Sequence, residues 1–114
     1  MELRTGVSHV GGTVVLAVEG VADLSTAPHL HRALNRLQPP DGSTVAVDLD
    51  GLAVLDDVAV GLLLGAAARL RERGGELVLV CSAPRLRSRL DSLRVDRIVH
   101  VSASIASVDG RATR

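Results

Sequence analysis

No phenylalanine, tyrosine or tryptophan occurs anywhere in the 114 residues of the chain. Single-stranded nucleic acids bind largely by stacking their bases on aromatic side chains, so the composition argues against that class of ligand. The chain also lacks lysine, and 13 arginines balance 13 acidic residues to a formal net charge of zero. Duplex DNA needs a basic face, which this balance does not offer. Without aromatic rings, the core must consist of leucine, valine, isoleucine and alanine.

Cysteine is represented by Cys81 alone, which excludes an internal disulfide. It ends the strand-like run Glu76–Cys81, where a buried thiol acts as a small hydrophobic side chain.

No hydrophobic segment follows the N-terminal residues, so we expect no signal peptide. The longest apolar stretch, residues 58–68, is shorter than the roughly 20 residues that a membrane span needs. We therefore expect a cytoplasmic protein. All basic side chains other than histidine are arginine, which we interpret as the codon usage of a GC-rich genome. This codon usage indicates a bacterial source.

Strand-like runs and helical periodicities alternate along the rest of the chain. We expect strands at residues 7–10, 13–18, 44–48, 76–81 and 98–101, and helices at residues 27–37, 57–73 and 84–93, with a terminal helical turn near 105. This β-β-α-β-α-β-α-β-α order predicts an α/β fold, in which three or four helices pack against a mixed, mostly parallel sheet of four or five strands. The first strand is expected to run antiparallel to its neighbour. We assign residues 1–109 to one domain and residues 110–114 to a frayed C-terminal tail.

The stretch Val54-Leu-Asp-Asp-Val58 places two carboxylates before the most apolar segment of the chain. Asp56 is expected to cap the following helix, because its oxygens can accept hydrogen bonds from the N–H groups of the first turn. The negative charge of Asp57 is expected to be stabilised by the positive end of the helix dipole. Catalysis by the pair is disfavoured, since adjacent helical residues diverge by about 100°. A phospho-accepting aspartate would need a magnesium site. Asp48 and Asp50 are near enough in sequence to contribute, but the lysine that such proteins use is absent. We expect no metal and no cofactor.

The helix after these aspartates is apolar on every side from Val58 to Ala66. A surface helix of a small domain is normally amphipathic. Its outer face near the N-terminus must therefore be covered by loops and a neighbouring helix, or by a partner protein. The sequence leaves both explanations open.

Several other polar residues have an ordinary structural interpretation. Arg85, Arg87 and Arg89 alternate along the third predicted helix, and we interpret them as a solvated helix face. Ser25 and Ser82 are alternative phosphorylation sites, but each also fits a cap or a turn. None of these residues alone assigns a function.

Four segments follow one another in an order that identifies a family. They are Gly20–Ala27, the strand and loop Val47–Asp56, the second helix and fourth strand Gly61–Val80, and the third helix and closing strand Ser82–Ile98. Together they resemble the STAS domain of anti-sigma factor antagonists, small bacterial proteins that bind anti-sigma kinases. The resemblance spans nearly the whole chain and implies a single STAS-like α/β domain.

The chain departs from the family pattern at the two aspartates. STAS antagonists normally read Asp-Ser-Ser/Thr-Gly-Leu where this chain reads Asp56-Asp57-Val58-Ala59-Val60. In the family, the anti-sigma kinase phosphorylates the first serine, and phosphorylation releases the anti-sigma factor. Asp57 therefore stands at the phosphoacceptor-equivalent position without a hydroxyl. Its single negative charge could partly imitate a phosphoserine, whose charge is about −1.5 to −2. It could instead pair with a cationic side chain of the partner. In the third alternative, Asp57 is only a helix-start residue and the phosphorylation switch has been lost. We favour loss of the switch with protein binding retained.

The resemblance implies a binding protein without enzymatic activity, cofactor or metal. Its expected partner is an anti-sigma factor of the serine-kinase type. We expect no binding to nucleic acid or membrane, and a monomer or weak dimer. The expected contact residues are Asp23, Leu24, Ser25, Asp56, Asp57, Val58, Ala59 and Val60. Three alternatives remain: an accessory subunit of a transporter or signalling assembly, a sensor of a small ligand or nucleotide, and a phosphotransfer protein that uses Asp57.

Overall fold

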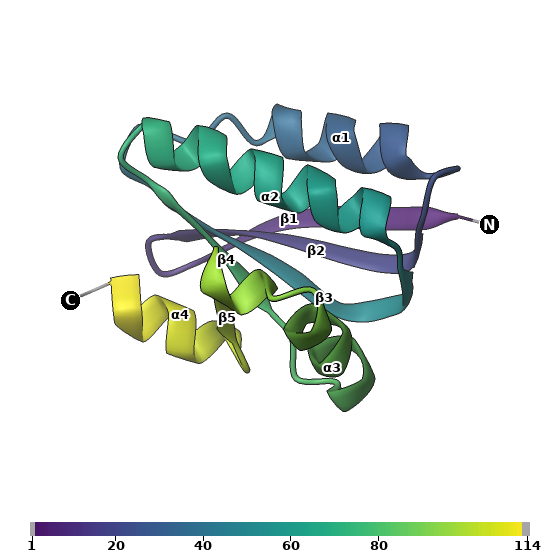
Figure 1. Ribbon diagram of the computed structural model, residues 1–114. Coiled ribbons are helices and arrows are strands. Elements are labelled where there is room, and N and C mark those ends of the chain that lie inside the picture. The colour runs from purple at the N-terminus through teal and green to yellow at the C-terminus, as the bar shows by residue number, and fades with distance from the viewer. Residues whose placement is uncertain (1, 113–114) are drawn as a thin grey trace.

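A five-stranded sheet forms the centre of the computed structural model, which describes residues 2–112 (Figure 1). The strands are β1 (Leu3–Val10), β2 (Thr13–Ala22), β3 (Thr44–Leu55), β4 (Glu76–Val80) and β5 (His100–Ser102). They lie side by side in sequence order, with β1 antiparallel to β2 and all other neighbours parallel. The predicted mixed, mostly parallel sheet is therefore confirmed.

Within the described residues, four α-helices pack on this sheet. They are α1 (Ala27–Arg36), α2 (Asp57–Glu72), α3 (Pro84–Ser92) and α4 (Ile105–Ala112), and a short 3-10 helix, η1 (Val95–Arg97), follows α3. Helices α1 and α2 run side by side over one face of the sheet, and α4 lies against the other face (Figure 1). Because β2, β3 and β4 are parallel, their carboxyl ends share one edge of the sheet, where α1 and α2 begin.

The main core, between the sheet and helices α1, α2 and α3, is aliphatic apart from one thiol. Val47, Leu63 and Leu79 are among its fully buried side chains. Cys81 is buried with them, and burial raises the pKa of its thiol, which stays protonated. The predicted packing role of this cysteine is therefore confirmed. A smaller cluster around Val108 lies between α4 and the opposite face of the sheet.

An irregular ladder brings the carboxyl ends of β2 and β3 together. The register shifts between Ala17 and Glu19 and again between Gly20 and Val21. Gly20 has a φ of +101°, in the left-handed region that favours glycine. The strands approach so closely at Gly51 that a Cβ there would lie 2.6 Å from the Cβ of Glu19. Pairing resumes beyond this point, so β3 extends past the predicted end of its strand.

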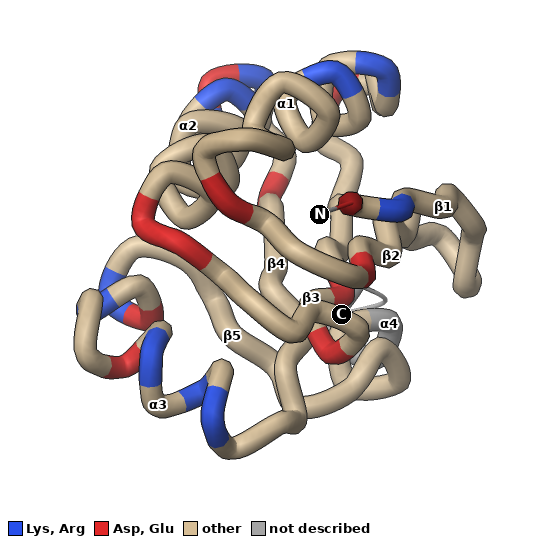
Figure 2. The backbone as a smooth tube through the Cα atoms, turned by 90° about the vertical axis from the view of Figure 1, so that its right-hand side faces the viewer, with Lys and Arg blue, Asp and Glu red and all other residues tan. Residues whose placement is uncertain are grey.

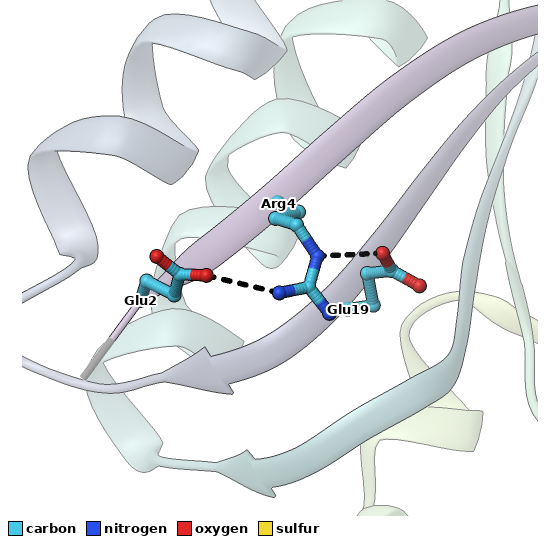
Figure 3. A network of polar contacts seen from close by, with 3 residues as sticks. All are labelled: Glu2, Arg4 and Glu19. Atoms are coloured by element: carbon cyan, nitrogen blue, oxygen red, sulfur yellow. Dashed lines mark hydrogen bonds and ion pairs between the residues drawn. The ribbon is translucent and has the colours of Figure 1, made fainter.

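The outer strand β1 is tied to β2 by a surface ion network (Figure 3). Nε of Arg4 lies 2.8 Å from Oε1 of Glu19, its cross-strand neighbour, and Nη1 lies 3.0 Å from Oε1 of Glu2. The hydrogen bond to Glu19 is the main reason that the pKa of Arg4 is raised. All three side chains are more than half exposed, so the network contributes little to global stability.

The C-terminal region differs from the expectation in two places. The predicted strand at 98–101 is displaced, because η1 occupies Val95–Arg97 and β5 begins at His100. Helix α4 continues to Ala112, so part of the predicted tail at 110–114 is helical, and residues 113 and 114 lie outside the described residues. None of the helices described is both long and apolar enough to span a bilayer.

Candidate functional site

A single carboxylate holds the loop between β2 and α1. Oδ1 of Asp23 accepts hydrogen bonds from the backbone N–H groups of Ser25 (2.9 Å) and Thr26 (3.1 Å), and from the Ser25 hydroxyl (2.7 Å). The bond from the Ser25 hydroxyl is the largest reason that the pKa of Asp23 lies below its usual value, and burial opposes it. The Thr26 hydroxyl donates to the carbonyl of Val21 (2.8 Å). Asp23 therefore holds a turn through its side chain, and the loop has a defined shape.

This loop presents an apolar side chain to solvent. Leu24 is 72% exposed, more than any other large hydrophobic residue of the described chain. The hydrogen bonds of Asp23 fix the backbone on either side of it, which keeps Leu24 away from the core. Burying one leucine side chain contributes about 1.5–3 kcal/mol. Leu24 is therefore suited to enter an apolar pocket of another protein.

The N-terminus of α2 lies beside this loop. The backbone N–H of Asp56 donates to the carbonyl of Ala22 (2.9 Å), which continues the pairing of β2 and β3 past the end of the sheet. Asp56 is the N-cap of α2, and its Oδ1 accepts the N–H of Asp57 (3.2 Å). The predicted capping role of Asp56 is confirmed. Figure 2 shows two acidic stretches at this end of the molecule, one where β2 leads into α1 and one where β3 leads into α2.

A guanidinium from α3 pairs with the aspartates at the start of α2. Nη2 of Arg89 lies 2.6 Å from Oδ1 of Asp57 and 3.8 Å from Oδ1 of Asp56. The Asp57 side chain remains 74% exposed, whereas that of Arg89 is 39% exposed. Exposed pairs of this kind contribute only about 0–1 kcal/mol to folding stability. The main effect of the pair is that Arg89 balances one negative charge of this surface.

The other two arginines of α3 also bind within the chain. Arg85 donates to the carbonyl of Leu52 (3.3 Å), and Arg87 donates to the carbonyl of Cys81 (3.2 Å). The interpretation of Arg85, Arg87 and Arg89 as a solvated face is incomplete. Arg85 is exposed and the other two are partly exposed, but all three guanidinium groups also bind within the chain. The helix is short and packs on the core, so its long side chains reach the ends of β3 and β4 and the start of α2.

The first turn of α2 separates the predicted contact residues into two groups. Asp56 and Asp57 are exposed, and Val58 is 41% exposed. Ala59 and Val60 are 0% and 5% exposed and belong to the core. Their assignment as partner contacts is therefore corrected: the helical period of 3.6 residues turns these two side chains toward the sheet.

The chain itself covers part of the apolar outer face of α2. Leu62 and Leu64 are half-buried and pack against the main core, and Gly61 is exposed but adds no side chain. Intramolecular packing thus accounts for the two leucines. Besides Leu24, the large hydrophobic side chains left exposed at this end of the molecule are Val58 and Val54, the latter 40% exposed.

A carboxylate that the sequence suggested only as a magnesium ligand joins β3 to the start of α3. Oδ1 of Asp50 accepts the N–H groups of Ser82 (2.8 Å) and Ala83 (3.1 Å), and Oδ2 accepts the Ser82 hydroxyl (2.8 Å). Burial alone would raise the pKa of Asp50, but the Ser82 hydroxyl and the two N–H groups outweigh it and hold the pKa below its usual value. Within residues 2–112, no three acidic, histidine or cysteine side chains are grouped to hold a metal ion.

The substitution Asp50→Asn is expected to remove a pH-dependent part of the stability. The pKa of Asp50 is lower in the folded chain than in the unfolded chain, so its carboxylate stabilises the fold above about pH 4 and loses this effect as the pH falls through the folded pKa. Since the side chain is exposed, the difference at neutral pH should be about 1 kcal/mol. Urea unfolding at a series of pH values measures it. A difference between wild type and variant that did not narrow at acid pH would contradict the expectation.

The sequence of the chain matches a known protein family and a characterised relative. The family model described as STAS domain matches residues 5–108. The anti-sigma-B factor antagonist of Listeria monocytogenes is 36% identical over 69 residues, which cover 60% of this chain and 60% of that protein. The match thus spans less than two thirds of the relative's length.

Solved structures share the whole architecture at low sequence identity. An anti-sigma factor antagonist from Mycobacterium paratuberculosis aligns with a TM-score of 0.87 and 22% identity, covering 99% of this chain and 96% of that one. An anti-sigma-factor antagonist (STAS) domain protein from Planctomyces limnophilus aligns with a TM-score of 0.79 and 16% identity, covering 96% and 98%. At these identities, the likeness shows the fold.

Proposed function

The chain belongs to the STAS domain family, and on that premise we propose that it acts as an anti-sigma factor antagonist, binding an anti-sigma factor of the serine-kinase type. The name of the Listeria relative, an anti-sigma-B factor antagonist, supports this class of partner. The proposed activity is reversible protein binding, without a catalytic step, a metal or a cofactor.

The proposed docking surface consists of Asp23, Leu24, Ser25, Asp57 and Val58. The observation that carries the proposal is the rigidly hydrogen-bonded loop that exposes Leu24 beside the start of α2. Apolar anchors with a rim of polar and charged groups are typical of protein interfaces. The surface also lies at the carboxyl ends of parallel strands, where loops carry binding functions in α/β folds.

The docking surface is proposed to have no phosphorylation switch at residue 57. Asp57 takes the position that the resemblance assigns to the phosphoacceptor, and a carboxylate cannot be modified as a serine hydroxyl is. The hydroxyls of Ser25 and Ser82 are engaged with carboxylates, at 2.7 Å from Asp23 and 2.8 Å from Asp50. Binding is therefore proposed to be constitutive, with its strength set by the fixed charges of the surface.

Affinity capture from the native cells, with wild type beside Asp57→Ser, tests this function. We expect wild type to retain a serine-kinase-type anti-sigma factor, and Asp57→Ser to retain it as long as residue 57 is not phosphorylated. We also expect phosphate to appear on residue 57 of the serine variant alone, because only that form has the hydroxyl. Mass spectrometry of the captured proteins and of the bait measures both results. If neither form captured such a regulator, the proposed partner would be contradicted, even though the fold stands.

A further inference from the structure

We propose that Arg89 sets the binding state of the docking surface: by pairing with Asp57, it cancels one negative charge and keeps the surface competent to bind without any modification. This inference rests on the proposed function. It concerns a residue of α3 that no sequence pattern connects with the start of α2.

The position of the Arg89 guanidinium is fixed by the chain itself. Leu86 and Leu90, on the same helix, are both fully buried in the main core. Nε of Arg89 is also buried and has no hydrogen-bond partner among the described atoms, whereas its Nη2 reaches Asp57 at 2.6 Å. The side chain therefore lies with its stem against the protein and its charged end turned toward α2.

The charges at this point sum to a small value. Asp56 and Asp57 contribute −2, and Arg89 contributes +1, so the three groups carry −1 together. A phosphoserine of about −1.5 to −2 in place of Asp57 would bring the same three groups to about −1.5 to −2 in total, because the charges of Asp56 and Arg89 cancel. Asp57 paired with Arg89 is thus a poor imitation of a phosphate, and loss of Arg89 would move the surface toward the phosphorylated, released state of the family.

Arg89 is the arginine of α3 suited to this role. Arg85 and Arg87 direct their guanidinium groups to the backbone carbonyls of Leu52 and Cys81. Within the described chain, Arg89 is the α3 arginine that forms ion pairs with the aspartates at the start of α2. A change at position 89 should therefore alter the charge of the docking surface while the anchoring of the strand ends is preserved.

Binding of the purified chain to the anti-sigma-B factor of Listeria monocytogenes, the regulator that the relative's name specifies, tests the inference by titration calorimetry. We expect Arg89→Gln to weaken binding about tenfold, because it leaves the negative charge of Asp57 unpaired at the rim of the interface. Adding Asp57→Asn to this variant should restore most of the affinity. Arg36→Gln, an equal change of charge on an exposed residue at the C-terminal end of α1, should bind as wild type does. Circular dichroism confirms that each variant is folded.

The outcomes separate this inference from the proposed function. Equal affinities of the Arg89→Gln and Arg36→Gln variants would overturn the role of Arg89 alone, as would a double variant that stays as weak as Arg89→Gln. If wild type does not bind, the proposed function fails for this regulator. The pairing is then judged by nitrogen–proton NMR of the arginine side chains. An Arg89 Nε–Hε signal that shifts in Asp57→Asn supports the contact, and an unchanged signal overturns it.

Discussion

Replacing Leu24 by aspartate is expected to weaken binding to the captured anti-sigma factor by about a hundredfold and to leave the fold intact. The side chain is 72% exposed and contributes nothing to the core. Burying a leucine in a partner pocket contributes about 1.5–3 kcal/mol, and aspartate would instead bring a charge that must lose its water on binding. Titration calorimetry measures the affinity, and circular dichroism shows that the variant is folded.

Val7→Asp is the matched control for this experiment. Val7 is also a large exposed hydrophobic residue, at 58%, but it lies on β1, in a strand outside the proposed docking surface. The substitution adds the same charge and removes a similar apolar area. If both variants lost affinity equally, the effect would be one of net charge, and Leu24 would not be an anchor.

Leu63→Ala should lower the free energy of unfolding by about 3 kcal/mol, within the range of large-to-small substitutions in buried cores. Leu63 is 1% exposed and lies on the side of α2 that faces the sheet. A domain of this size has only about 5–15 kcal/mol of stability in total. The core also has no aromatic ring to shift into the space, so the cavity should remain.

Urea unfolding followed by far-ultraviolet circular dichroism measures this loss, because the chain has no tryptophan or tyrosine for fluorescence. Leu62→Ala is the internal control: it removes the same atoms from the adjacent, half-buried position and should cost about 1 kcal/mol. Similar losses for the two variants would show that α2 does not pack through Leu63 as described.

The order of strands and helices was readable from the sequence because each element carries a local pattern. Periodic leucines, glycine turns and apolar runs gave the element order and the mixed, mostly parallel sheet. The ends of the elements were less predictable. Strand β3 was expected to stop at Asp48, yet it continues to Leu55. Residues Gly51–Leu55 form a strand because β2 pairs with them beyond a register shift, and no local pattern encodes that pairing.

The candidate site shows the same division. The adjacent carboxylates and the helix that follows were visible in the sequence, and Asp56 caps that helix as expected. The assignment of Ala59 and Val60 to the surface was wrong, since a helix that is apolar all round does not reveal which side faces the sheet. Arg89 was missed because the residue it binds, Asp57, is 32 positions away.

The sequence by itself determined the aliphatic core, the α/β class and the lack of a hydroxyl at residue 57, because these depend on residue identity and short-range periodicity alone. The tertiary structure decided which side of α2 is buried, how far β3 extends and which cation lies against Asp57. These depend on contacts between segments far apart in the chain, and such contacts exist only when the sheet and its helices have packed together.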